Sequence, residues 1–289
     1  TTKKLAPLHN PPNLMGIDVC TKLMPGVPQV AVFDTAFHQT MPAYAYTYAI
    51  PYRYYQEDHV RRYGFHGTSH RYVSSRTAEL LQDQIEQPKI ITCHLGAGSS
   101  LCAVAGAASM DTSMGFTPLS GLVMSTRCGD IDPAIVAFIM EKEQCSLPGV
   151  IDILNRQSGV LGISGVSPDF RDLEKEAQMG HERARLALAV FAYSVARGIG
   201  SLMPAIGGLD ALAFTAGVGE NSSPMRRRIC GFLSWLNIVL DEDRNTNGEG
   251  ERVISTRESK IKVFVVPTDE EKMIACETRA VLQNIEKAP

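Results

Sequence analysis

The sequence predicts an α/β protein, and three observations lead to that prediction. Short apolar runs rich in β-branched residues recur along the chain, longer stretches with helical spacing lie between them, and loops of small residues follow several of the runs. Strands that alternate with helices are typical of α/β folds and argue against the all-α and all-β classes. A length of 289 residues suits one large domain or two smaller ones.

Five strands are expected from apolar runs. The first ends at Asp34 and precedes a loop-like aromatic segment, the second and third are joined by a glycine turn and should form a hairpin, and the last two precede further loops. These strands are expected at 28–34, 89–95, 100–106, 211–216 and 262–268.

Helices are expected between and after these strands, where apolar residues recur with a helical period. Asp132 and Pro133 are a typical start for one of them. The expected helices cover 70–82, 134–142, 180–204, 225–233 and 269–285.

Composition limits the classes of function. Hydrophobic residues make up 44% of the chain, so a substantial buried core is expected instead of disorder. The 28 basic and 31 acidic residues are intermixed, which disfavours nucleic acid or an anionic membrane as a partner. Seven scattered cysteines without a C-x-x-C pair, and no evident membrane-spanning run or signal sequence, predict a cytoplasmic protein with reduced thiols. The Pro-rich start without methionine suggests a fragment.

Glycine-bearing loops are the first candidates for chemistry. Segments 94–100 and 215–221, and the shorter 162–165, appear to follow strands. Glycine lets backbone N–H groups approach phosphate oxygens, and two such loops suit a nucleoside triphosphate. Neither matches a Walker A or G-x-G-x-x-G motif, and each alone favours the simpler interpretation of a plain tight turn.

His66 and Arg127 lie in small-residue loops with room for a ligand, as a transferring phosphoryl group requires. A surface salt bridge and a hydrogen-bonded loop histidine are the simpler alternatives. His66 and His70 stand four residues apart, but no third ligand accompanies them, which disfavours a metal pair. A Ser or Cys hydrolase is disfavoured as well, because no G-x-S-x-G elbow is present.

Carboxylates follow the first and last expected strands. Asp34 is compatible with a base, a metal ligand or a cap for the next turn. Asp269, Glu270 and Glu271 could hold Mg²⁺, or they could be acids favoured by a helix N-terminus.

Seven segments closely resemble the acetate/propionate kinase family, in family order along the whole chain. They are VFDTAFHQTMP, RRYGFHGTSHRYVS, CHLGAGSSLCAV, DTSMGFTPLSGLVMSTRCGDIDP, SGVLGISGVSPDFRDLE, FTAGVGENSS and PTDEEKMIA. The resemblance implies the acetate-and-sugar-kinase/Hsp70/actin (ribonuclease H-like) fold. It also implies an enzyme that interconverts ATP plus a short carboxylate (acetate or propionate) with ADP plus an acyl phosphate.

The resemblance also implies residue roles. Asp34, His66 and Arg127 match the catalytic set, Glu270 matches a Mg²⁺ position, and His9, Phe65 and Pro118 match the substrate pocket. The positions implied for ATP contacts are His94, Leu95, Gly96, Ala97, Gly98, Asp169, Phe170, Arg171, Gly217, Val218, Gly219, Glu220 and Asn221.

The chain departs from the family pattern at several positions. Ala97 stands where an Asn is expected, Ser125 and Ala216 replace glycines, and Asp269 replaces an Asn. The family's amino-terminal phosphate-binding hairpin is also expected to be missing. The resemblance therefore implies an incomplete first domain (1–38 and 273–289) and a second domain (39–272) with the ATP site and a homodimer interface. The alternative function is a catalytically inactive fragment that retains nucleotide binding or dimerisation.

Overall fold

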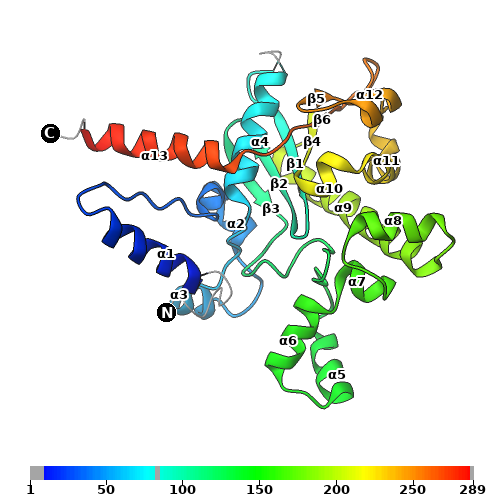
Figure 1. The fold of residues 1–289 in the computed structure, drawn as a ribbon, viewed down its shortest axis with the longest axis horizontal. Helices are drawn as coiled ribbons and strands as arrows, with labels where there is room; N and C mark the ends of the chain where they lie inside the picture. The colour runs from blue at the N-terminus through cyan, green and yellow to red at the C-terminus, as the bar shows by residue number, and fades with distance from the viewer. Residues whose placement is uncertain (1–9, 82–84, 287–289) are drawn as a thin grey trace.

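The computed structural model describes residues 10–81 and 85–286 (Figure 1). Its centre is a six-stranded sheet with strand order β3-β2-β1-β4-β6-β5. Strands β1, β4 and β6 are parallel, whereas β2, β3 and β5 pair antiparallel with their neighbours. The strands are β1 (Lys89–Leu95), β2 (Ser99–Ala105), β3 (Ala108–Thr112), β4 (Ala211–Thr215), β5 (Arg252–Val253) and β6 (Lys262–Val265).

Helices cover both faces of this sheet. In the described residues they are α1 (Asn10–Leu23), α2 (Ala43–Tyr46), α3 (Arg53–Asp58), α4 (Gly67–Leu80), α5 (Ala134–Glu143), α6 (Leu147–Arg156), α7 (Gly159–Ser164), α8 (Phe170–Gln178), α9 (Glu182–Ile206), α10 (Ala216–Asn221), α11 (Ser223–Phe232), α12 (Glu242–Asn247) and α13 (Glu270–Glu286), with 3-10 helices η2 (Ala36–Thr40) and η3 (Ser234–Leu236).

The two faces of the sheet form two separate hydrophobic cores. On β1, Ile91 and Cys93 pack with α9 and α8 on one face, whereas Ile90 packs with α4 on the other. This alternation follows from the two-residue period of a strand, and burial on both faces explains the unbroken apolar runs. The central strands are therefore held on both sides, which fixes the loops at their carboxyl ends.

Helix α9 is long and apolar enough to cross a membrane by length and composition. The expectation that no apolar run approaches that length is therefore wrong for this segment. Its buried residues, such as Phe191, Val195 and Ile199, pack against the sheet. The hydropathy of α9 is accounted for by its place as the main core helix.

Four of the five expected strands are confirmed with small shifts of their ends, and so is the hairpin. The expected strand at 28–34 is wrong: this segment is irregular, and Phe33 is 67% exposed. A strand is stable only beside a partner, and this segment pairs with no strand in the described part of the chain.

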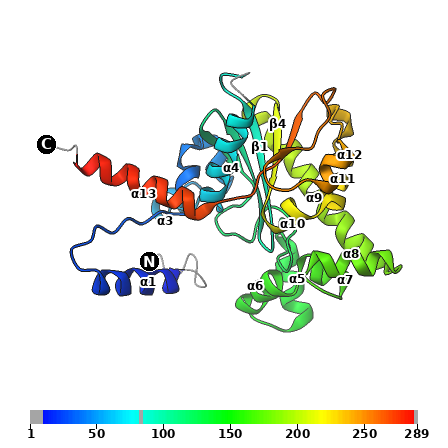
Figure 2. The same cartoon turned by 45° about the horizontal axis from the view of Figure 1, so that its top comes forward.

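Residues 10–35, which we call the arm, stand apart from the sheet. In both Figure 1 and Figure 2, α1 and α13 extend from the same side of the molecule. Within the described residues α1 packs extensively against no other element, whereas α13 packs on α4 and joins it through an Arg71–Glu277 ion pair of 2.6 Å. The arm returns to the body only at its end, near Asp34.

Candidate active site

The candidate site lies at the carboxyl ends of β1, β4 and β6. These parallel strands end next to one another, with His94 beside Thr215 in the register, so the loops that follow them converge. Ligands in open α/β sheets commonly bind at this edge. The glycine loop after β1, helix α10 after β4 and helix α13 after β6 all begin here.

Asp34 reaches the site through hydrogen bonds with the start of α4. The amide of His66 donates to Asp34 Oδ2 at 2.7 Å, and the amide of Gly67 donates to the Asp34 carbonyl at 2.8 Å. His66 has a positive φ of 56°. These bonds satisfy amides that a helix start leaves without intrahelical partners, and a carboxylate there is favoured by the helix dipole.

His66 and Arg127 meet over the glycine loop after β1. A Cβ atom placed on Gly98 would lie 3.3 Å from His66 Nε2 and 3.5 Å from Arg127 Nη1. Arg127 is held by its Nη1, which donates to the carbonyl of Pro118 at 3.2 Å. The structure therefore brings together an imidazole, a guanidinium and glycine backbone, and any side chain at Gly98 would press against both groups.

Burial keeps the histidines of the site neutral. His66 stacks on His94 with 4.0 Å between ring centroids. Burial is the main cause that lowers the pKa of His66 to about 4, with a further contribution from the positive charge of Arg127. Burial, followed by His66, lowers the pKa of His94 to about 3. Burial of the Arg127 guanidinium also lowers its pKa.

His66 and His70 are linked through one serine hydroxyl. His66 Nδ1 and His70 Nε2 both lie within hydrogen-bond distance of Ser100 Oγ, and His70 Nδ1 contacts Thr92 Oγ1. Among the described residues no group of three or more His, Cys, Asp or Glu side chains is arranged to hold a metal ion. Three ring nitrogens of the two histidines are thus engaged by hydroxyl groups.

Glu270 is the carboxylate after β6 that feels the charge of Asp34. Burial is the main cause that raises the pKa of Glu270, and the negative charge of Asp34 contributes further. Glu270 lies in the first turn of α13, and Asp269 caps that turn by accepting from the amide of Lys272 at 2.9 Å. The helix-terminus explanation therefore holds for Asp269, whereas Glu270 is half-buried and feels the charge of Asp34.

The predicted loop at 217–221 is helix α10, which corrects the sequence analysis. The Glu220 carboxylate stabilises its start by accepting from the amide of Ala216 at 2.7 Å, and it also accepts from the amide of Thr268 at 3.3 Å. Buried Arg226 donates to the carbonyls of Gly219 and Glu220. Glycines that resemble a loop in sequence thus form a short helix whose ends are held by side chains.

The third glycine segment, 162–165, is also not a loop after a strand. Gly162 lies inside helix α7, which ends at Ser164. Gly165 follows with a φ of 69°, a left-handed conformation typical of a glycine that ends a helix. This segment is a helix terminus.

At the start of α8, Asp169 and Arg171 form an exposed pair. Asp169 caps the helix by accepting from the amide of Arg171 at 2.8 Å, and its bonds with Arg171 lower its pKa to about 2. Phe170 instead points into the core, with its ring 4.6 Å from that of Phe191. Glu174, one turn further, accepts from Ser222 after α10, which places α8 beside α10.

Comparison with known proteins decides the family. The model of the acetokinase family matches residues 1–276. The chain belongs to the acetokinase family.

Sequence relatives of this acetokinase chain agree. It is 59% identical over 282 residues to an acetate kinase of Thermoanaerobacter pseudethanolicus, covering 97% of this chain and 70% of the relative. It is 58% identical over 279 residues to an acetate kinase of Methanosarcina barkeri, covering 96% of this chain and 68% of that relative. The protein is therefore a member of a kinase family.

Solved structures show the fold. The acetate kinase of Porphyromonas gingivalis superposes with a TM-score of 0.92 at 48% identity, over 97% of this chain and 71% of that one. A propionate kinase of Francisella tularensis gives 0.89 at 46%, over 95% and 70%. The acetokinase chain thus has the acetate-and-sugar-kinase fold, as the resemblance implied.

The remaining predicted positions have different surroundings. His9 lies outside the described residues. Phe65 and Pro118 are partly exposed, and their carbonyls accept hydrogen bonds from His38 and Arg127 respectively. In the glycine loop of this acetokinase, Leu95 is buried in the core and Ala97 is exposed. Leu95, like Phe170, can meet a ligand only through its backbone.

Sequence reasoning missed the hydroxyl groups behind the histidines. Ser69, Thr92, Ser100 and Thr268 all contact histidines or one another in the acetokinase site. The signal that could have found them is polarity inside buried strands, because Thr92 interrupts the apolar run of β1 and Ser100 begins that of β2. A buried hydroxyl requires a hydrogen-bond partner.

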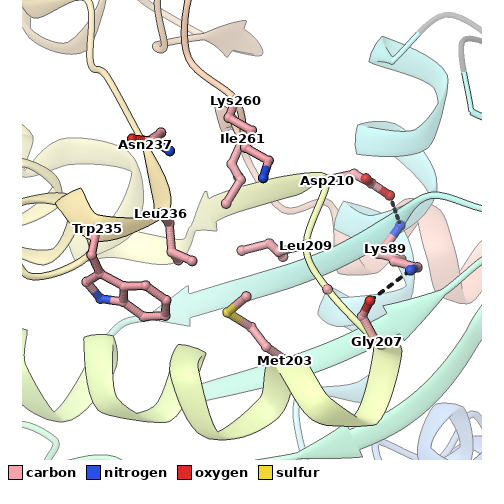
Figure 3. A pocket seen from close by; sticks show the side chains of 11 residues that line it. Lys89, Met203, Gly207, Leu209, Asp210, Trp235, Leu236, Asn237, Lys260 and Ile261 are labelled. Atoms are coloured by element: carbon pink, nitrogen blue, oxygen red, sulfur yellow. Dashed lines mark hydrogen bonds between the residues drawn. The ribbon is translucent and has the colours of Figure 1, made fainter.

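A hollow of about 370 Å³ lies at the other end of the parallel strands, away from the candidate active site (Figure 3). The amino group of Lys89, at the start of β1, donates to the carbonyl of Gly207, and the Lys89 amide donates to Asp210 before β4. This edge carries the amino ends of the parallel strands. The hollow is therefore separate from the candidate active site.

Proposed function

We propose that this acetokinase transfers the γ-phosphoryl group of ATP to the carboxylate of a short-chain acid, acetate or propionate. The products are ADP and an acyl phosphate, and the reaction is reversible. The observation that carries the proposal is the convergence of His66 and Arg127 over Gly98, with Asp34 bonded to the same turn. Positive and N–H-bearing groups at one point suit the negative oxygens of a transferring phosphoryl group.

Direct in-line transfer requires little covalent chemistry from the protein. The acceptor is already an anion, so no base is needed to activate it, and positioning and charge neutralisation remain. Arg127 neutralises the phosphoryl oxygens, and His66 donates a hydrogen bond to them. Phe65 and Pro118 contribute the apolar pocket for the alkyl group, together with His9.

The nucleotide is proposed to bind along the glycine loop after β1, helix α10 and the start of helix α8. Gly96, Ala97 and Gly98 offer backbone N–H groups, and α10 and the start of α8 lie on the other side. Ser222 and Glu174 connect α10 to α8, so the predicted contacts at Asp169–Arg171 and Gly217–Asn221 belong to one surface. Leu95 and Phe170 support this surface from the core.

Mg²⁺ fits the carboxylates that are present. The negative charge of Asp34 contributes to the raised pKa of Glu270, and a divalent cation between such groups would offset this like-charge interaction. Magnesium is usually held by one or two carboxylates together with substrate phosphates and water. Glu270 is proposed to hold the ion, which would neutralise charge on the nucleotide phosphates.

The proposal extends to the assembly and domain arrangement. Residues 1–38 and 273–289 are assigned to a first domain and 39–272 to a second, which carries the ATP site and a homodimer interface. The protein is proposed to work in the cytoplasm. Size-exclusion chromatography with light scattering tests the dimer, and a monomer at working concentrations would contradict it.

A second candidate is a catalytically inactive protein that retains nucleotide binding or dimerisation. The exposed methyl group of Ala97 favours it, because this position faces the phosphate loop without a polar group. The loosely packed arm favours it too, since Asp34 lies at the arm's end.

Acyl hydroxamate formation from ATP, Mg²⁺ and acetate or propionate distinguishes the two candidates. Arg127→Ala should lower the rate about a thousandfold, since an arginine that neutralises a transferring phosphoryl group is worth at least that much. Arg156→Ala is the matched control, because this exposed side chain pairs only with Asp152 at 2.9 Å. Wild-type protein that binds ATP in calorimetry but forms no hydroxamate would support the inactive candidate.

A further inference from the structure

Four side chains form a continuous hydrogen-bonded chain behind His66. Thr92 Oγ1 lies 2.7 Å from His70 Nδ1, His70 Nε2 lies 2.7 Å from Ser100 Oγ, and Ser100 Oγ lies 2.8 Å from His66 Nδ1. Thr92, His70 and Ser100 are fully buried. A hydroxyl has one proton and a neutral imidazole has one N–H, so the three bonds point in the same direction when the buried Ser100 hydroxyl donates its proton within the chain.

The geometry at Thr92 selects that direction. Its hydroxyl has two acceptors within reach, His70 Nδ1 at 2.7 Å and the Cys102 carbonyl at 3.4 Å. The shorter contact has the ordinary length for an O–H donor, whereas the longer one is outside that range. With Thr92 donating to Nδ1, His70 carries its proton on Nε2 and donates to Ser100, which donates to His66 Nδ1. The proton of neutral His66 is then on Nε2.

A second chain of hydroxyl groups acts on His94 in the same way. The Thr268 hydroxyl donates to Ser69 Oγ at 2.8 Å, and Ser69 Oγ lies 2.8 Å from His94 Nδ1. With Ser69 accepting from Thr268 and donating its single proton to His94 Nδ1, the imidazole proton of neutral His94 is on Nε2. Each of the two stacked rings thus accepts a hydrogen bond from a serine hydroxyl at its Nδ1 atom.

The other ring nitrogens are available to a ligand. Within the described part of the chain, neither His66 Nε2 nor His94 Nε2 has a hydrogen-bond partner, and His66 Nε2 faces Gly98. Phosphoryl oxygens only accept hydrogen bonds, so they require N–H at these positions. Two imidazolium rings 4.0 Å apart would repel each other, and the low pKa values of both histidines agree with neutral rings.

We propose that Thr92, His70 and Ser100, and in parallel Thr268 and Ser69, are positioning residues that hold His66 and His94 in the neutral Nε2–H tautomer. The hydroxyl chains let two uncharged rings act as N–H donors toward a phosphoryl group without taking up a proton. This inference rests on the proposed function for the identity of the ligand, but the tautomer itself is a property of the free protein.

Nitrogen-15 spectra of histidine-labelled full-length chain test the tautomer near neutral pH. Long-range correlations between ring protons and nitrogens report which nitrogen carries the proton, and His66→Ala and His94→Ala identify the two signals. We expect N–H at Nε2 and a bare Nδ1 for both rings. A proton on Nδ1 of wild-type His66 would overturn the proposal, whether or not the protein shows kinase activity.

Two variants and one control then test the hydroxyl chains. Ser100→Ala should move part of the His66 population to the Nδ1–H tautomer and leave His94 unchanged, and Ser69→Ala should do the reverse. The control is Ser74→Ala, because among the residues that the structure describes this buried hydroxyl bonds only to the Arg71 carbonyl of its own helix. Thr92→Ser keeps a hydroxyl and should preserve the wild-type tautomers.

The kinetic expectation is smaller than for a catalytic residue. Ser100→Ala should lower kcat about tenfold with little change in the KM for ATP, since one ordinary hydrogen bond is at stake. Equal spectra and equal kcat for Ser100→Ala and Ser74→Ala would show that the serine only fills space. If wild-type protein is inactive, the proposed function fails, and the spectra alone still decide the tautomer.

Discussion

Similar apolar residues are buried in the sheet body and exposed in the arm. In the body, Phe214 and its neighbours in β4 are fully buried between two layers of helices, whereas in the arm Leu23 and Phe33 are 75% and 67% exposed. Both regions contain apolar, β-branched runs. The difference is the presence of a partner: β4 lies between β1 and β6, and segment 28–34 has no neighbouring strand in the described residues. An apolar, β-branched sequence favours a strand, but the strand forms only where a neighbouring strand and a packed layer are present.

The contrast also separates two ways of placing a functional group. His94 is held by its strand, its stacking partner and the hydroxyl of Ser69. Asp34 is held by bonds to the amides of His66 and Gly67 at the start of α4. The body therefore contributes rigid groups, whereas the arm contributes one group through a short contact.

The largest expected effect compares two phenylalanines. Phe214→Ala should lower the free energy of unfolding by about 3–5 kcal/mol, because it opens a cavity in the densest part of the sheet. Phe33→Ala should change it by less than about 0.5 kcal/mol, because the exposed ring has little to lose. Urea unfolding monitored by circular dichroism measures both. Similar losses for the two variants would show that the arm packs as tightly as the body.

Adjacent arginines in α11 sharpen the comparison inside the body. Arg226 is buried and donates to the carbonyls of Gly219 and Glu220 and to Asn245, so Arg226→Leu should cost about 3 kcal/mol of unfolding free energy. Arg227 pairs with Glu242 at the surface, so Arg227→Ala should lower the free energy of unfolding by at most about 1 kcal/mol. Thermal unfolding measures the stability lost by each variant. A larger loss for Arg227→Ala than for Arg226→Leu would contradict the prediction.

Sequence alone predicted the parts of this molecule that depend on local pattern. The buried strands and amphipathic helices of the body follow from unbroken β-branched runs and helical spacing, which local sterics and burial enforce. The short helix α10 was missed, because its stability comes from Glu220 and Arg226, whose contacts depend on the fold.

The site was predictable as a list of residues but not as a geometry. The resemblance named Asp34, His66 and Arg127, yet nothing in their spacing predicts that the His66 backbone amide holds the Asp34 carboxylate. The hydroxyl chains behind the histidines were also hidden, since they join residues from α4, β1 and β2. Such contacts arise only when distant segments pack together.

Acid should weaken the body through its buried histidines. Burial lowers the pKa of His38 from 6.5 to about 4, so the folded state disfavours the protonated ring. Stability from this group is complete above pH 6.5, the unfolded value, and is lost as pH falls toward 4. Between pH 7 and 5 His38 alone should account for about 2 kcal/mol of lost unfolding free energy. Urea titrations at both pH values measure this loss.

His38→Gln tests that assignment. The variant starts from lower stability, because His38 contacts Ser109 and the Phe65 carbonyl, but its stability should depend less steeply on pH. The control is His59→Gln. His59 ends α3 with a left-handed backbone conformation and lies outside the histidine cluster. An equally steep slope for His38→Gln would assign the acid sensitivity to other groups.

A smaller effect on stability than that of His38 protonation is expected where the arm meets the body. A Cβ at Gly67 would overlap the carbonyl oxygen of Asp34, so Gly67→Ala must move one of the two segments. Because the arm is loosely packed, it should give way, at a cost of about 1 kcal/mol for the lost hydrogen bond. Hydroxamate formation should nevertheless fall at least about tenfold, since Asp34 leaves its place beside His66.

Gly231→Ala is the matched control, because a Cβ there meets no atom within 4 Å on its helix. It should leave activity unchanged and raise stability slightly, as alanine favours a helix over glycine. If Gly67→Ala keeps full activity at unchanged stability, the contact between Asp34 and α4 is dispensable, and the arm holds its carboxylate by other means. If it instead destabilises the protein as strongly as Phe214→Ala, the arm is part of the body's packing, and the contrast between the two regions disappears.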